Sequence, residues 1–228
     1  MSDVAAEQIT ALGGTEKSIE IYPNHEVALG RLSVWRALPI RERRMVGPWC
    51  FLDRFGPCAF TDGKPMEIAP HPHIGLQTVT WLLEREALHN DSLGYEALLR
   101  AGGVNVMTAG SGIAHAERTP SRNSGRLNGA QLWVALPDAD RNVAAGLQHL
   151  PDVPRLDMSG GVAQVFAGSI AEAVSPARHF SSIVGADITL HAGPNPLELP
   201  LDPGHEHALL LTAGECTLEG QRLGPNML

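Results

Sequence analysis

The sequence predicts an all-β fold, and two observations support this prediction. Glycine and proline are plentiful, at 24 and 17 of 228 residues, as is typical of proteins with many turns between short strands. Apolar runs of strand length alternate with turn sequences such as Asp91-Ser92-Leu93-Gly94, Gly102-Gly103 and Gly110-Ser111-Gly112. No apolar run is long enough to predict a membrane-spanning helix.

The expected strands follow one another along the chain. Short strands are expected at 18–22 and 32–35, before an apolar block at 49–55. A turn at 61–65 then leads to the histidine-rich segment. The run 77–83 is apolar almost throughout, which predicts a strand buried by a barrel on one face and by a second domain on the other. The remaining expected strands are 97–99, 104–108, 131–136, 162–166, 186–190, 197–199, 208–211 and 215–218.

One helix is expected, at 138–150. Asp138 is a suitable N-cap, and an apolar stripe would follow it, formed by Val143, Ala144, Leu147 and Leu150. Pro151-Asp152-Val153-Pro154 then indicates a linker. These features predict an N-terminal domain at 1–137, a short helix and linker at 138–154, and a C-terminal domain at 155–228.

Four residues in two pairs form the candidate metal site. His71 and His73 are spaced i, i+2, as are His115 and Glu117. Side chains two apart in a strand lie on the same face, so neighbouring strands could bring three imidazoles and one carboxylate together. Such ligands suit a divalent first-row ion, with Fe(II), Mn, Ni, Cu and Zn all chemically possible. His89 and the pair His205 and His207 are interpreted as structural or surface histidines.

Charge and composition exclude several classes of function. The formal net charge of −8 argues against a general electrostatic grip on nucleic acid. The basic cluster of Arg36 and Arg41 to Arg44 is interrupted by Glu42, which favours ion pairs or a solvated turn. Residues 1–17 lack the basic start and apolar core of a secretory signal, and the three cysteines follow no disulfide or zinc pattern, so a cytoplasmic location is expected.

Several segments together resemble the pirin family, in the family's order. They are Gly47-Pro48-Trp49-Cys50-Phe51-Leu52-Asp53-Arg54-Phe55-Gly56-Pro57, His71-Pro72-His73-Ile74-Gly75-Leu76-Gln77-Thr78-Val79-Thr80, Asp91-Ser92-Leu93-Gly94 and Met107-Thr108-Ala109-Gly110-Ser111-Gly112-Ile113-Ala114-His115-Ala116-Glu117. The resemblance implies a bicupin, with two jelly-roll barrels and a mononuclear iron in the N-terminal one. It also implies that His71, His73, His115 and Glu117 are the iron ligands.

Two features depart from what the resemblance implies. The general cupin pattern has a glutamate at the position of Gln77, which leaves the hydrogen-bonding role of this position open. The second barrel is expected to be incomplete, because a chain that resembles pirins would continue with further strands beyond Leu228. We therefore expect a truncation, or a partner chain that covers the exposed strand edges.

The resemblance implies a flavonol (quercetin) 2,3-dioxygenase. Iron with two open positions could bind the 3-hydroxyl and 4-carbonyl oxygens of a small aromatic substrate, and O2 would then open the ring. Glu117 would ligate the iron and could accept the hydroxyl proton. Phe51, Asp53 and Met107 are candidate substrate-binding residues. Asp53 could instead form a buried ion pair with Arg54.

A second class of function remains open at this point. Some relatives would act as non-enzymatic iron or redox sensors that bind a protein partner, such as a transcription factor or a metabolic enzyme. The acidic charge argues against direct nucleic-acid binding but not against such a partner. A metal-dependent sugar isomerase is less favoured, because no phosphate-binding cluster lies near the histidines.

Overall fold

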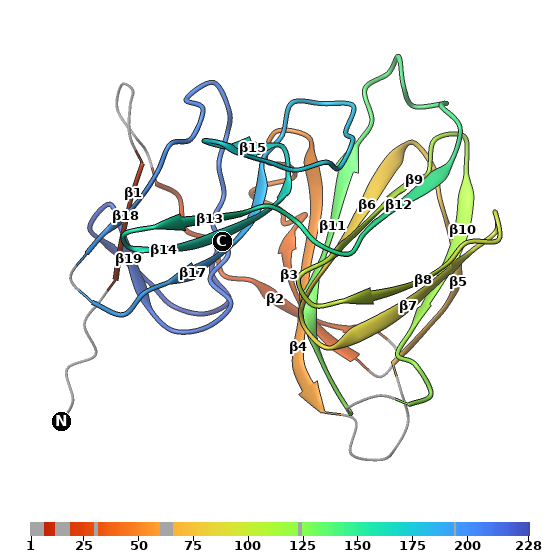
Figure 1. Cartoon of the computed structure of the whole chain (residues 1–228), viewed down its shortest axis with the longest axis horizontal. Coiled ribbons are helices and arrows are strands. Elements are labelled where there is room, and N and C mark those ends of the chain that lie inside the picture. The colour runs from red at the N-terminus through yellow and green to blue at the C-terminus, as the bar shows by residue number, and fades with distance from the viewer. Residues whose placement is uncertain (1–6, 12–18, 30–31, 60–65, 123–124, 194) are drawn as a thin grey trace.

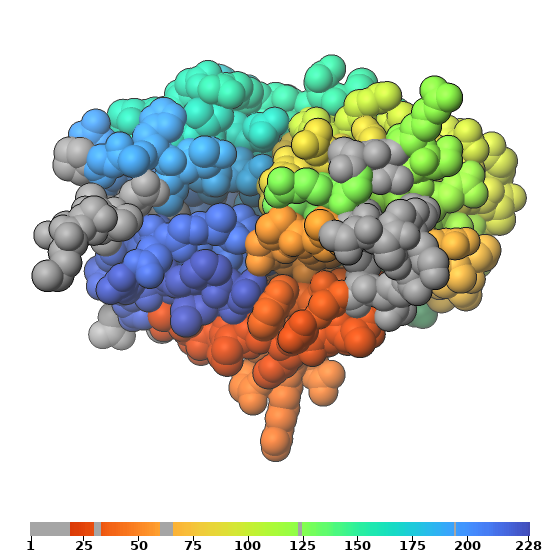
Figure 2. Space-filling view, turned by 90° about the horizontal axis from the view of Figure 1, so that it is seen from below, coloured from red at the N-terminus to blue at the C-terminus, as the bar shows by residue number. Residues whose placement is uncertain are grey.

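The computed structural model describes residues 7–11, 19–29, 32–59, 66–122, 125–193 and 195–228. Within these ranges every regular element is a β-strand, and no helix that could span a membrane is found there. The strands form two lobes, which lie side by side in Figure 1. Figure 2, seen from below, shows residues of the early part of the chain, in red and orange, along one edge of both lobes. The prediction of an all-β fold is confirmed.

The first lobe is a barrel made of two facing sheets. The smaller sheet has the order β5-β10-β7-β8, with bounds Glu67–His73, Ile113–Arg118, Glu86–Asp91 and Glu96–Arg100. The larger has the order β12-β9-β6-β11-β4-β3-β2, with bounds Gly146–Leu150, Val104–Thr108, Leu76–Glu84, Arg126–Ala135, Trp49–Ala59, Leu32–Leu38 and His25–Leu29. Neighbouring strands are antiparallel, so side chains alternate between the barrel interior and its outer face.

Strand β6 is buried on both faces, as its sequence predicts. Val79 and Trp81 pack in a cluster with Phe166 and Ile183 of the second lobe. The Trp81 indole also donates a hydrogen bond to Asp187, at 3.2 Å. On the opposite face, Thr78 and Thr80 are buried, and Thr80 contacts the smaller sheet of the barrel. The central strand of the barrel therefore also forms the contact with the second lobe.

The second lobe combines strands from both ends of the described chain. One sheet has the order β18-β1-β19-β20, with bounds Leu197–Leu199, Glu7–Ala11, Cys216–Leu218 and Gln221–Leu223. Strand β1 pairs in parallel with both β18 and β19. The other sheets are β13-β14-β17, at Arg155–Met158, Gly161–Ala167 and Gly185–Leu190, and β15-β16, at Ser169–Ile170 and Ala173–Val174.

The expected helix at 138–150 is wrong. Residues 138–143 form turns, and residues 146–150 form β12, which pairs with β9 at the edge of the larger sheet. The helix-like spacing of apolar residues in 138–150 did not decide the structure. The backbone groups on the edge of β9 need hydrogen-bond partners, and pairing with β12 supplies them. Leu147 then lies opposite Met107. Asp138 does not cap a helix; its carboxylate contacts Arg141 at 3.4 Å.

Two expected strands are also wrong, and one expected turn lies outside the described residues. Residues 19–22 form no strand; Tyr22 instead exchanges two backbone hydrogen bonds with Leu228. Residues 208–211 form no strand either, and Leu211 hydrogen-bonds to the backbone near the chain end. The predicted turn at 61–65 falls in a range that the structure does not describe. The other expected strands are found, to within one residue at either end, in β3, β4, β6, β8, β9, β11, β14, β17, β18 and β19.

Replacing Gly110 with alanine is expected to destabilise the barrel. Gly110 has a φ of +49°, and an added Cβ would lie 1.9 Å from the carbonyl oxygen of Val143. Residues with such a φ cost about 1–3 kcal/mol on their own, and the backbone clash adds to that. Gly75 is the matched control, because it has a φ of +68° with nothing within 4 Å of the added Cβ. Chemical denaturation should show a larger loss for Gly110→Ala than for Gly75→Ala; equal losses would contradict the clash.

Candidate metal centre

The histidine pairs meet on the inner face of the smaller sheet. In the antiparallel pairing of β5 with β10, His115 lies opposite His71, and Ile113 lies opposite His73. The three imidazole rings are close together, with centroid distances of 4.9 Å for His71–His73, 4.5 Å for His71–His115 and 5.0 Å for His73–His115. The i, i+2 spacing in the sequence therefore produces the expected cluster of three histidines.

The separations between ring nitrogens suit coordination of one ion. Nε2 of His73 and Nε2 of His115 are 3.1 Å apart, and one nitrogen from each of the three rings lies within 4.8 Å of the others. Two nitrogen ligands about 2.1 Å from an ion and at right angles to each other lie about 3.0 Å apart. The three rings could thus hold a divalent first-row ion without moving far.

Two of the three rings, those of His73 and His115, are in the protonation state that metal binding requires. Burial lowers the pKa of His73 to about 4, and the nearby His71 contributes to the decrease. Burial lowers the pKa of His115 to about 3, with further contributions from neighbouring histidines. Both imidazoles are therefore neutral at pH 7, and neutral imidazole is the form that binds metals. Nδ1–H of His71 donates to the Ala69 carbonyl at 2.9 Å, so Nε2 of His71 carries the free lone pair.

Glu117 lies deeper in the barrel than its spacing from His115 suggests. The register shifts between the two residues, so that Glu117 lies opposite Ile68. Its Oε1 is 3.2 Å from the hydroxyl of Thr80 on the facing sheet, and burial raises the pKa of its carboxyl group. Glu117 does not fall within the compact group of the three histidines. It forms a second potential ligand group with His89 and His115.

His89 is buried beside His115, which the sequence interpretation missed. Its side chain is 5% exposed, its Nδ1 is 3.3 Å from Nδ1 of His115, and it lies opposite Glu117 in the pairing of β10 with β7. A signal was present in the sequence, because His89 and Asp91 have the same i, i+2 spacing as the other pairs. His115 thus contacts histidines through both of its ring nitrogens.

The comparisons with known proteins agree with this fold. The family model described as Pirin matches residues 31–134. The chain is 44% identical over 200 residues to a Pseudomonas aeruginosa protein provisionally named a quercetin 2,3-dioxygenase, covering 87% of this chain and 62% of that one. It is 38% identical over 205 residues to the "Pirin-like protein" of Caulobacter vibrioides, covering 86% of this chain and 69% of that one. The chain belongs to the pirin family.

Structural comparison supports the same assignment. A crystal structure of quercetin 2,3-dioxygenase from Acinetobacter baumannii matches this pirin-family chain with a TM-score of 0.73 at 42% identity. The match covers 75% of this chain and 57% of that one. The bicupin architecture is therefore confirmed. The domain boundaries and the incompleteness of the second barrel stay predictions.

Aromatic residues connect the centre to the opposite wall of the barrel. Phe51 stacks on Trp133, with centroids 4.0 Å apart and planes at 13°, and Trp133 meets the His73 ring edge-to-face at 5.0 Å. The guanidinium of Arg36 lies 4.7 Å from the centroid of the Phe51 ring. Phe51 thus reaches the centre through Trp133, and its role as a pocket residue stays a prediction. Trp133 is closer, and the sequence analysis did not single it out.

The other two candidate pocket residues are tightly packed. Both carboxylate oxygens of Asp53 accept hydrogen bonds from Arg36, each at 2.8 Å. The expected ion pair between Asp53 and Arg54 is therefore wrong: Asp53 pairs with Arg36, and Arg54 donates to Asn226. Met107 is 1% exposed and packs against Ala109 and Ile113.

Gln77 faces away from the histidine cluster, toward the second lobe. It is fully buried, and its Nε2 donates to Thr108 and to the Arg178 carbonyl at 3.0 and 3.1 Å. Its Oε1 is 3.0 Å from Nδ1 of His179. An uncharged amide that both donates and accepts suits this buried position. Gln77 therefore links the two lobes.

Two of the hollows among the described residues bear on the candidate site. One of about 480 Å³ is mostly apolar and includes His73 in its wall, together with Pro72, Ile74, Ser92, Gly112, Ile113 and Ala114. The other, of about 330 Å³, lies in the second lobe and includes none of the four predicted ligands. His73 is the one predicted ligand in the wall of the first hollow.

Proposed function

We propose that this chain contains the catalytic centre of a metal-dependent flavonol 2,3-dioxygenase that acts on quercetin or a similar small aromatic substrate with O2. The observation that carries the proposal is the cluster of three histidines beside a buried carboxylate in the barrel. The similarity to quercetin 2,3-dioxygenases supports the choice of substrate. A cytoplasmic location and a protein partner stay predictions from the sequence.

His71, His73 and His115 would hold the metal ion, with Glu117 as a fourth ligand or a base. Fe(II) is the proposed ion, although the same donors accept Mn, Ni, Cu or Zn. A bound divalent iron would supply a Lewis acid for the adjacent hydroxyl and carbonyl oxygens of a flavonol and a place for O2 beside them. The chain's own residues would orient the substrate and manage its proton.

Glu117 is suited to accept the flavonol hydroxyl proton. Burial raises the pKa of its carboxyl group, which makes the ionised form a stronger base. The proton would pass from the 3-hydroxyl to a carboxylate oxygen of Glu117. The single hydrogen of the Thr80 hydroxyl can go to the ionised carboxylate of Glu117, at 3.2 Å, or to Oε1 of Gln131, at 2.9 Å. When it goes to Gln131, the hydroxyl can accept from the protonated Glu117, so Thr80 can stay in contact in both states.

The aromatic residues would position the flat substrate. Phe51 and Trp133 are half-buried and form a stack that reaches His73. Rings packed in this way could hold a flavonol by offset or edge contacts. Met107 would add an apolar contact from strand β9. Asp53 would act through Arg36, which it holds over the ring of Phe51.

Oxygen uptake with quercetin tests the proposal. We expect oxygen consumption with anaerobically iron-loaded protein, and none with metal-stripped protein or with His71→Ala. The control is His25→Ala, which removes an exposed histidine in β2 and should consume oxygen at the wild-type rate. Tight iron binding without oxygen uptake would overturn the dioxygenase proposal and favour the iron-sensing alternative.

A further inference from the structure

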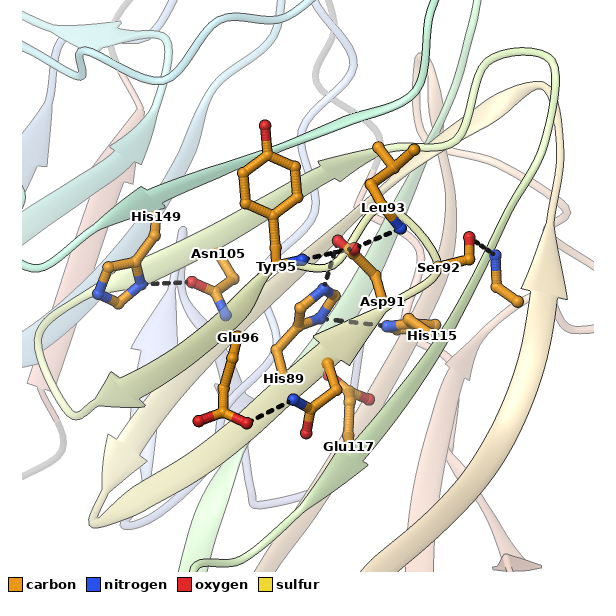
Figure 3. Close-up of polar contacts among 12 residues, drawn as sticks. His89, Asp91, Ser92, Leu93, Tyr95, Glu96, Asn105, His115, Glu117 and His149 are labelled. Atoms are coloured by element: carbon orange, nitrogen blue, oxygen red, sulfur yellow. Dashed lines mark hydrogen bonds and ion pairs between the residues drawn. The ribbon is translucent and has the colours of Figure 1, made fainter.

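A chain of side-chain contacts leads from the buried carboxylate of Asp91 through His89 to His115 of the candidate metal centre. Asp91 Oδ2 is 3.1 Å from Nε2 of His89, and Nδ1 of His89 is 3.3 Å from Nδ1 of His115. Nε2 of His115 then faces His73, at 3.1 Å. Figure 3 shows Asp91, His89 and His115 joined in this order by two contacts. Neither Asp91 nor His89 is among the predicted ligands.

The carboxylate sets the direction of the hydrogen bonds. A carboxylate can only accept, so Nε2 of His89 must carry a hydrogen. When the His89 ring carries this single hydrogen, its Nδ1 is an acceptor and Nδ1 of His115 is the donor. This arrangement leaves the lone pair of His115 on Nε2, the atom that faces the other two histidines.

Asp91 is held firmly enough to impose this order. Its side chain is fully buried, and its second oxygen, Oδ1, accepts from the backbone N–H groups of Leu93 and Tyr95 at 2.9 and 3.1 Å. Ser92 ties the same turn to β10 through two bonds with Ala114, the neighbour of His115. Asp91 also lies directly opposite His115 in the pairing of β10 with β7.

We infer that Asp91 and His89 are positioning residues that hold His115 as the Nδ1–H tautomer and so present its Nε2 to the metal. The inference rests on the proposed function, because it assigns His115 as a ligand. Partners of this kind, which hydrogen-bond the far nitrogen of a ligating histidine, typically change metal affinity by about 10–100-fold when they are removed.

The variant Asp91→Asn reverses the hydrogen bonds without changing the size of the side chain. The amide oxygen must stay at the Oδ1 position, because two backbone N–H groups point to it. The amide NH2 then faces Nε2 of His89, which becomes an acceptor, and Nδ1–H of His89 donates to His115. His115 is left with its hydrogen on Nε2, where it blocks coordination.

Two measurements test the inference, and one needs no metal. In the metal-free protein, ¹H–¹⁵N correlation spectra of the imidazole rings should show His115 as the Nδ1–H tautomer in the wild type and as the Nε2–H tautomer in Asp91→Asn. Anaerobic titration with Co(II), followed by its visible absorption, should show affinity about 10–100-fold weaker for Asp91→Asn. His89→Phe, which lacks the acceptor, should also bind more weakly, and His89→Asn should recover part of the loss.

The controls separate this inference from the proposed function. Asp138→Asn makes the same change at a carboxylate that is 99% exposed and should bind Co(II) like the wild type. The Nε2–H tautomer in the wild type, or unchanged affinity in Asp91→Asn and His89→Phe, would overturn the inference. If neither the wild type nor any variant binds Co(II), the proposed metal site fails. The tautomer of His115 in the metal-free spectra still decides whether Asp91 and His89 set its hydrogen position.

Discussion

His115→Ala is expected to lose metal affinity by at least about 100-fold, because even loss of an outer partner costs about 10–100-fold. His115 contributes to both potential ligand groups, so its removal leaves neither group intact. The metal-free protein should also lose about 1–3 kcal/mol of stability, because His89 would lose the partner of its buried Nδ1. Metal content after dialysis and chemical denaturation measure the two effects.

The control for this variant is His149→Ala. His149 lies beside Asn105 in Figure 3, with Nδ1 2.7 Å from the amide oxygen, and belongs to neither histidine group. It should retain wild-type metal content. If His115→Ala retained metal as well as His149→Ala does, the three-histidine centre would be the wrong site.

Glu117→Gln is expected to lower turnover of quercetin by about 10²–10⁴-fold, the usual contribution of a general base. The amide has the same shape as the carboxylate and can still accept the hydrogen bond from Thr80, but it cannot take up a proton. The measurement is the steady-state rate of oxygen uptake by iron-loaded protein, together with its iron content.

Iron content separates the two roles proposed for Glu117. If the variant keeps its iron and loses turnover, Glu117 acts as the base. If iron is lost together with turnover, Glu117 is a ligand in the working enzyme. Thr80→Val provides a milder comparison, because it removes only the hydroxyl next to the carboxylate and should cost less than Glu117→Gln. Wild-type turnover in Glu117→Gln would exclude both roles.

The side-chain alternation of strands made much of the centre predictable. His71, His73 and His115 came together because residues two apart share a face and because glycine-rich turns reverse the chain between the strands. The position of Glu117 was less predictable, because the register shift between His115 and Glu117 depends on pairing with β5. His89 was missed because it matches no ligand position of the pirin family. Its burial depends on the pairing of β7 with β10, which places it opposite Glu117.

Other features depend on contacts between distant segments, which no local pattern contains. The sequence 138–150 has a reasonable helical stripe, but the open edge of β9 decides its structure. Gln77 occupies a position where the cupin pattern has an acid, and only the packed structure shows that the side chain faces Arg178 and His179. The pairing of β1 with β18 and β19 likewise has no signature in the first residues.

The pairing of β1 has a consequence for the order of events during synthesis. The first barrel uses residues 25–150 and can close as soon as they have left the ribosome. Strand β1 is made before the strands of this barrel, whereas its partners, near Leu197 and Cys216, are made after them. Contacts between such distant segments form slowly because the intervening chain must be closed into a loop. Strand β1 is therefore paired only after the barrel strands that follow it in the sequence, and until then its backbone edges are exposed to other chains.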